Sequence, residues 1–72
     1  MFLVTEMQDN NEHVGTLSYE FDNKDDAFAK YHTILAAAAK SDVMYHGAAI
    51  YENCMLVNYQ AFEHLNNEET LD

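Results

Sequence analysis

The feature that most constrains the fold of this chain is the strict alternation of side chains from Gly15 to Phe21. The apolar set is Leu17, Tyr19 and Phe21, and the polar set is Thr16, Ser18 and Glu20. A period of two is typical of a strand that is buried on one side and exposed on the other. We therefore expect an antiparallel sheet with one covered face.

Further strands are predicted on both sides of this segment. Residues Phe2–Met7 are rich in β-forming side chains, and the polar run from Asp9 to His13 that follows them favours a turn. Later in the chain, Gly47–Tyr51 and Cys54–Phe62 have the composition of strands, with Glu52-Asn53 as the predicted turn between them. The sequence thus predicts two hairpins.

A helix is predicted between the two hairpins, from Asp25 to Lys40. Asp22 or Asn23 can cap its N-terminus, where acidic side chains are favoured by the helix dipole. Apolar residues recur every three or four positions, and a run of alanines has the highest helix propensity. The predicted apolar stripe consists of Ala27, Phe28, Tyr31, Ile34, Leu35 and Ala38.

These elements predict an α+β fold of order β-β-α-β-β, in which one helix packs on one face of a four-stranded antiparallel sheet. We expect a single domain over residues 1–65, followed by a flexible acidic tail over residues 66–72. One helix cannot cover four strands, so apolar side chains should remain on the other face, and a homodimer is the simplest way to cover them. The predicted dimer face contains Tyr51, Tyr59 and Leu56, and Tyr45 and Phe62 are further candidates for exposure.

The charge of the chain restricts its partners. Thirteen Asp and Glu stand against three Lys and Arg together, which gives a formal net charge of -10 on 72 residues. Such a field repels nucleic acid and anionic membranes and attracts cationic protein surfaces. It also confers solubility, although -10 exceeds the magnitude of about 2 to 8 that solubility requires in a small domain. We interpret the carboxylates near the first turn and at the strand-to-helix junction as the candidate partner-binding residues: Glu20, Asp22, Asp25, Asp26, Glu6, Asp9 and Glu12.

The sequence carries no catalytic, cofactor or metal signature, so we expect a protein that is not an enzyme and binds no cofactor. The four histidines lack the short spacings of zinc ligands. Cys54 has no neighbouring Lys or Arg to lower the pKa of its thiol, and it is interpreted as a small apolar residue. The acidic run from Asp22 to Asp26 lacks the spacing of a calcium-binding loop.

The helix and the third predicted strand carry a resemblance to other proteins. The run Tyr31–Ala39, then Val43, then His46–Tyr51 resembles short uncharacterised proteins of prophages and mobile elements of Firmicutes. In small size and acidity the chain is also similar to anti-CRISPR proteins. That second likeness concerns size and composition and not particular residues, so it assigns a role to no residue.

Charge and resemblance together predict a phage-type inhibitor of a host defence nuclease. In this hypothesis the acidic surface acts as a DNA mimic and competes with nucleic acid for a basic groove, and a Cas nuclease is a candidate for the protein that carries this groove. The alternative is a homodimeric, non-catalytic accessory or interaction module of a mobile element. The start of the chain lacks the pattern of a signal peptide and no apolar run is long enough to span a membrane, so we expect a cytoplasmic location in a bacterial host cell.

Overall fold

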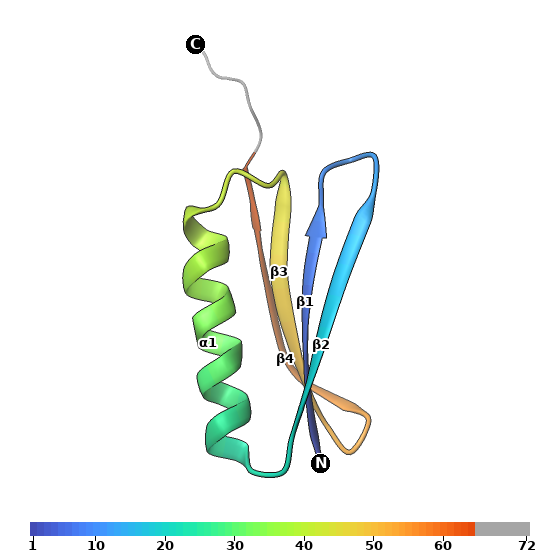
Figure 1. Cartoon of the computed structure of the whole chain (residues 1–72), viewed down its shortest axis with the longest axis vertical. Helices are drawn as coiled ribbons and strands as arrows, with labels where there is room; N and C mark the ends of the chain where they lie inside the picture. Colours follow the sequence, from blue (N-terminus) through green and yellow to red (C-terminus); the bar gives the residue numbers. More distant parts are fainter. Residues whose placement is uncertain (65–72) are drawn as a thin grey trace.

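The computed structural model describes residues 1–64 and has the predicted element order (Figure 1). Two strands are followed by one helix and two further strands. The elements are β1 (Phe2–Asp9), β2 (Val14–Phe21), α1 (Lys24–Lys40), β3 (Tyr45–Glu52) and β4 (Met55–Glu63). The α+β prediction is confirmed; the first three predicted strands are one to three residues longer than predicted, and the last is shifted by one residue. The tail predicted over residues 66–72 lies outside the described residues.

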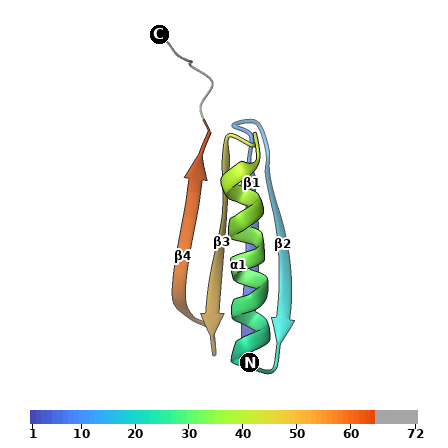
Figure 2. The same ribbon diagram turned by 90° about the vertical axis from the view of Figure 1, so that its left-hand side faces the viewer.

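All four strands form one antiparallel sheet in the order β2-β1-β3-β4. Phe2 of β1 pairs with Phe21 on one side and with Glu52 on the other, while Asp9 pairs with Val14 and Tyr45. The strands β2 and β4 are therefore the two edges, on either side of α1 in Figure 2. The register of β3 with β4 shifts between Ile50 and Tyr51, where a bulge interrupts the alternation of β4.

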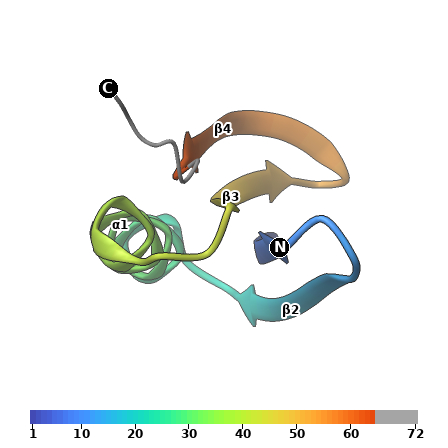
Figure 3. The same cartoon turned by 90° about the horizontal axis from the view of Figure 1, so that it is seen from above.

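Helix α1 lies along one face of the sheet, as the view along the strands shows (Figure 3). Asn23 caps its N-terminus by accepting a 2.8 Å hydrogen bond from the Asp26 backbone N–H. Because side chains three and four residues apart share one side of a helix, its apolar stripe points at the sheet. Ala27, Tyr31, Ile34 and Ala38 are the buried members of the predicted stripe, and Phe28 and Leu35 are partly buried beside them.

The core lies between α1 and the two central strands. Val4 of β1, Ile50 of β3 and Tyr31 of α1 are its largest fully buried side chains. Burial of such a side chain stabilises the folded state by about 1.5 to 3 kcal/mol. The alternation predicted for β2 is reflected in its burial only in part: Tyr19 and Phe21 pack against this core, whereas Leu17 remains 54% exposed.

The turn between β3 and β4 differs from the prediction. It is formed by Asn53 and Cys54, which adopt positive φ values of 50° and 70°, so Cys54 does not begin the strand. Two successive positive φ angles match the twist of a two-residue hairpin, a geometry that Asn accepts readily. The Met1 carbonyl accepts a 3.1 Å hydrogen bond from the Asn53 N–H, which ties the turn to the start of β1.

Within residues 1–64, no helix is long and apolar enough to cross a membrane.

Candidate partner-binding surface

The side of the sheet opposite α1 is uncovered, and we call it the open face. It is defined by the register, since residues paired across antiparallel strands point to the same side. Its apolar residues are Leu3, Met7, Val14, Tyr45, Tyr51, Leu56 and Tyr59. Leu56 and Tyr59 expose 59% and 54% of their surface. The predicted dimer residues Tyr51, Tyr59 and Leu56 thus lie on one face, whereas Phe62 pairs with His46 on the helix side and is partly buried.

Two hollows indent the open face. The larger, of about 440 Å³, is lined by Leu3, Glu20, Tyr51 and the Asn53-Cys54 turn among others. The smaller, of about 160 Å³, lies toward the other end of the strands and includes Asp9, Tyr45 and Tyr59 in its lining. Each hollow combines tyrosine rings with one carboxylate. A cationic side chain fits such a lining, because its stem packs on the rings while its head meets the carboxylate.

Four of the predicted partner-binding carboxylates gather where β2 passes into α1, and we call this group the acidic end. It consists of Glu20, Asp22, Asp25 and Asp26. All four residues are exposed. Asp26 also accepts a 3.0 Å hydrogen bond from the Asn23 side-chain amide, so it completes the cap as well as facing solvent. Asp22 and Asp25 are left to face solvent beside it.

The remaining three predicted carboxylates do not join the acidic end. Glu12 lies in the loop after β1, and Asp9 ends that strand, so both are near the opposite end of the sheet. Phe2 and Asp9 are separated by about 23 Å at roughly 3.3 Å per strand residue. Glu6 points to the helix side and pairs with His46. The seven carboxylates therefore do not form one continuous surface.

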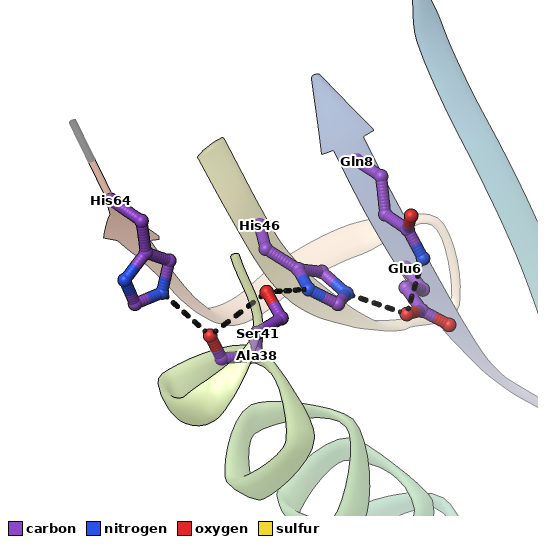
Figure 4. A network of polar contacts seen from close by, with 6 residues as sticks. All are labelled: Glu6, Gln8, Ala38, Ser41, His46 and His64. Atoms are coloured by element: carbon purple, nitrogen blue, oxygen red, sulfur yellow. Dashed lines mark hydrogen bonds and ion pairs between the residues drawn. The ribbon is translucent and has the colours of Figure 1, made fainter. Parts of the chain in front are cut away.

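A polar network that the sequence analysis did not predict joins Glu6 to the end of α1 (Figure 4). His46 is 5% exposed, and its Nε2 lies 2.7 Å from Glu6 Oε2 while its Nδ1 lies 2.8 Å from Ser41 Oγ. Burial by itself raises the pKa of Glu6, but hydrogen bonds from His46 and Gln8 outweigh it and bring that pKa below its usual value of 4.5. The one sequence signal that could have found this network is His46, a histidine directly before the run of small and apolar residues Gly47–Ile50.

The network fastens the C-terminus of α1 to the sheet. The Ser41 backbone N–H donates to the Ala38 carbonyl at 3.3 Å, and His64 Nε2 lies 2.8 Å from the same oxygen. A serine, a histidine and a carboxylate in this order are also the parts of an activated nucleophile. The backbone N–H nearest the hydroxyl is already engaged, however, so it is not free to stabilise an oxyanion. We assign the network a positioning role in the fold.

The cations of the chain are separated from the open face. Lys24, Lys30 and Lys40 are the only Lys or Arg residues, and all three belong to α1. Lys30 Nζ lies 4.2 Å from the centre of the Tyr19 ring, and Lys24 Nζ lies 5.9 Å from that of Phe28. The strands therefore present carboxylates and tyrosines without a Lys or Arg of their own, and the Met1 ammonium, just before β1, donates to Asn53 Oδ1 at 3.2 Å.

Over residues 1–64, no three His, Cys, Asp or Glu side chains gather closely enough to hold a metal ion. Cys54 is exposed in its turn and forms no disulfide. No protein-family model, curated protein or solved structure matches this chain.

Proposed function

We propose that this protein is a non-enzymatic inhibitor that binds a cationic, nucleic-acid-binding surface of another protein. The observation that supports this proposal most strongly is the separation of charge. Every Lys lies on α1, with Lys24 beside the carboxylates of the acidic end, while the open face carries carboxylates and exposed tyrosines but no Lys or Arg. Such a surface attracts Lys and Arg and repels nucleic acid.

The contact would centre on the hollow beside the acidic end. Glu20 shares that hollow with Leu3 and Tyr51, so an arginine could stack on the ring and pair with the carboxylate. Asp22 and Asp25 extend the negative surface along the first turn of α1. Positions three or four apart on a helix have Cβ atoms about 5 to 6 Å apart, which is comparable with the spacing of successive phosphates along a nucleic-acid strand. Asp22, just before the N-cap of α1, and Asp25, in the first turn, stand three positions apart. The acidic end would thus occupy sites that normally hold phosphates.

The biological setting of the proposal is a phage or other mobile element acting in the cytoplasm of a bacterial host cell. The target would be a host defence nuclease, for which Cas nucleases are the first candidates to test. Nucleic acid itself would not be a ligand, since the chain has too few cations to neutralise phosphates.

The experiment compares two variants of equal net charge in binding and DNA-cleavage assays with a panel of Cas nucleases. The first combines Glu20→Gln, Asp22→Asn and Asp25→Asn at the acidic end. The matched control combines Glu12→Gln, Asp42→Asn and Glu63→Gln at the opposite end. Asp26 is left intact in both because it helps to cap α1.

We expect the first variant to bind at least about tenfold more weakly, and the wild-type affinity to fall with rising salt. The control should stay within about threefold of the wild type, because its charges lie away from the contact and act only through the long-range field. Equal losses in both variants would show that only net charge matters. Inhibition that survives the first variant unchanged would contradict the proposal.

A second candidate function is a non-catalytic interaction module of a mobile element that docks through the open face. The exposed Leu56 and Tyr59 favour it, because a contiguous apolar surface of this kind usually marks a contact. Here the carboxylates would serve solubility alone. Binding to another subunit that is insensitive to salt and to the acidic-end variant, but lost with Tyr51→Ala, would favour this candidate.

A further inference from the structure

Strand β4 is an edge that nothing within residues 1–64 covers. Seven successive residues, from Met55 to Ala61, are exposed, so both sides of the strand face solvent. The strand contains no Pro, no Lys and no Arg, and its single acidic residue, Glu63, stands at its end. Natural edge strands are usually shielded by charges, prolines or covering segments. This strand lacks charges and prolines along most of its length, and the one irregularity in its pairing is the bulge opposite Ile50 and Tyr51.

The hydrogen-bonding pattern shows which backbone groups of β4 are free to pair. The His64 N–H donates to the Met44 carbonyl at 2.7 Å, which sets the alternation between β3 and β4. In an antiparallel pair every second residue bonds to its partner, so Gln60 and Phe62 bond to β3 while Tyr59 and Ala61 direct their N–H groups outward. In agreement, the Tyr59 N–H donates to the side-chain Oδ1 of Asn58 at 2.9 Å instead of to β3.

We propose that β4 pairs antiparallel with β4 of a second copy of this chain, with Tyr59 at the centre of the pairing. Since each copy has four strands, the pair would form one continuous sheet of eight. Tyr59 is the midpoint of Met55–Glu63. The alternation of β4 is regular from Asn58 to Glu63, and the bulge before Asn58 confines the regular pairing to the residues around Tyr59. The two Glu63 carboxylates stay far apart, at opposite ends of the two strands.

The distribution of charge shows where two copies of this chain can meet. A chain of net charge -10 repels itself wherever its acidic residues would meet. Face-to-face pairing of open faces would bring together surfaces that carry Asp9, Glu20 and Glu63. The uncharged stretch from Met55 to Phe62 is where two copies meet with little repulsion and the most apolar contact. The other edge, β2, carries Glu20 and leads into Asp22.

The symmetry of this pairing has a consequence for the open face. A two-fold axis perpendicular to the sheet leaves both helices on one side and both open faces on the other. The two Tyr59 side chains then lie next to each other at the axis. This inference does not depend on the proposed function, but it would double the surface available to a basic partner.

The test is sedimentation equilibrium of the whole chain over a range of concentrations, with variants at one outward-facing position. Ala61→Pro removes an outward N–H and leaves the hydrogen bonds to β3 in place, as proline is tolerated on edge strands. We expect it to weaken the dimer at least tenfold. Ala61→Ser keeps the N–H and should dimerise like the wild type, and circular dichroism should show the same fold for both.

Asn58→Ala tests the inference in the opposite direction. It removes the side-chain acceptor that now satisfies the Tyr59 N–H, so this N–H gains more from pairing with a second chain. We expect a dimer that is severalfold tighter than that of the wild type. A weaker dimer would contradict the proposed pairing.

The register is tested independently by Tyr59→Cys combined with Cys54→Ser, so that only one thiol remains. Hydrogen-bonded antiparallel residues lie about 5.5 Å apart between Cα atoms, within reach of a disulfide. We expect oxidation to crosslink two copies, whereas Leu17→Cys on β2 in the same background should not crosslink. A monomer at all concentrations, a dimer unaffected by Ala61→Pro, or equal crosslinking at both positions would overturn the proposal. If Ala61→Pro fails to fold, the cysteine comparison decides.

Discussion

The two sides of the sheet are built from alternate residues of the same four strands, yet they carry different chemistry. On the helix side, Val4 and Ile50 pack against Tyr31, and the polar groups of Glu6 and His46 satisfy each other. On the open side, tyrosines and leucines face solvent beside carboxylates. The comparison teaches that the helix side supports the fold while the open side is left for contacts.

Replacement of one tyrosine on each side should separate these roles most clearly. Tyr31→Ala removes a ring that is 1% exposed at the centre of the core, so we expect a loss of about 3 to 5 kcal/mol of stability. Tyr59→Ala removes a half-exposed ring on the open face and should change stability by about 0.5 kcal/mol or less. Urea unfolding at a concentration where the chain is monomeric measures both. Similar losses would contradict the distinction.

Substitution of Gly47 tests how closely the backbones of β3 and β4 approach each other. A Cβ at this position would lie 2.5 Å from the Gln60 carbonyl oxygen and 2.8 Å from the Ala61 Cα, so the backbone of β4 would have to move. We expect Gly47→Ala to cost about 2 to 3 kcal/mol through overpacking. Gly15→Ala is the control, since a Cβ there meets no atom within 4 Å. Thermal unfolding of both variants measures the difference, and equal effects would contradict close approach of β3 and β4.

The polar pair on the helix side should make stability depend on pH. The pKa of Glu6 is lowered in the folded state, so its contribution is complete above the unfolded value near 4.5 and is lost as pH falls through the folded value. We expect Glu6→Gln to cost about 1 to 2 kcal/mol at neutral pH. The difference from the wild type should shrink below pH 4.5. Chemical unfolding at several pH values checks this, and a difference independent of pH would contradict it.

Much of the fold was predictable because the relevant signals are local. The alternation of Gly15–Phe21 and the capped, apolar-striped helix each follow from neighbouring residues. The prediction of the Glu52-Asn53 turn was wrong by one residue, because Asn53 and Cys54 both adopt positive φ and only Asn53 signals that geometry. The bulge near Ile50 also left no mark in the sequence.

The candidate surface was predictable only in part. The junction carboxylates Glu20, Asp22, Asp25 and Asp26 are close in sequence and lie at one end of the molecule. Glu6 was placed with Asp9 and Glu12 near the first turn, and its pairing with His46, forty positions away, depends on the register of β1 with β3. The strand order could not be predicted for the same reason, because the pattern of two hairpins does not say which strands become the edges of the sheet.

By itself the sequence determined the type of each element, the amphipathic helix and the excess of negative charge. Only the tertiary structure decided which strands lie at the edges, which carboxylate is withdrawn into a hydrogen-bonded pair, and that no Lys lies on the open face. The physical reason is the distance along the chain over which each interaction acts. Turn, cap and periodicity preferences act between neighbours along the chain, whereas burial and the separation of charge depend on contacts between residues that the fold brings together.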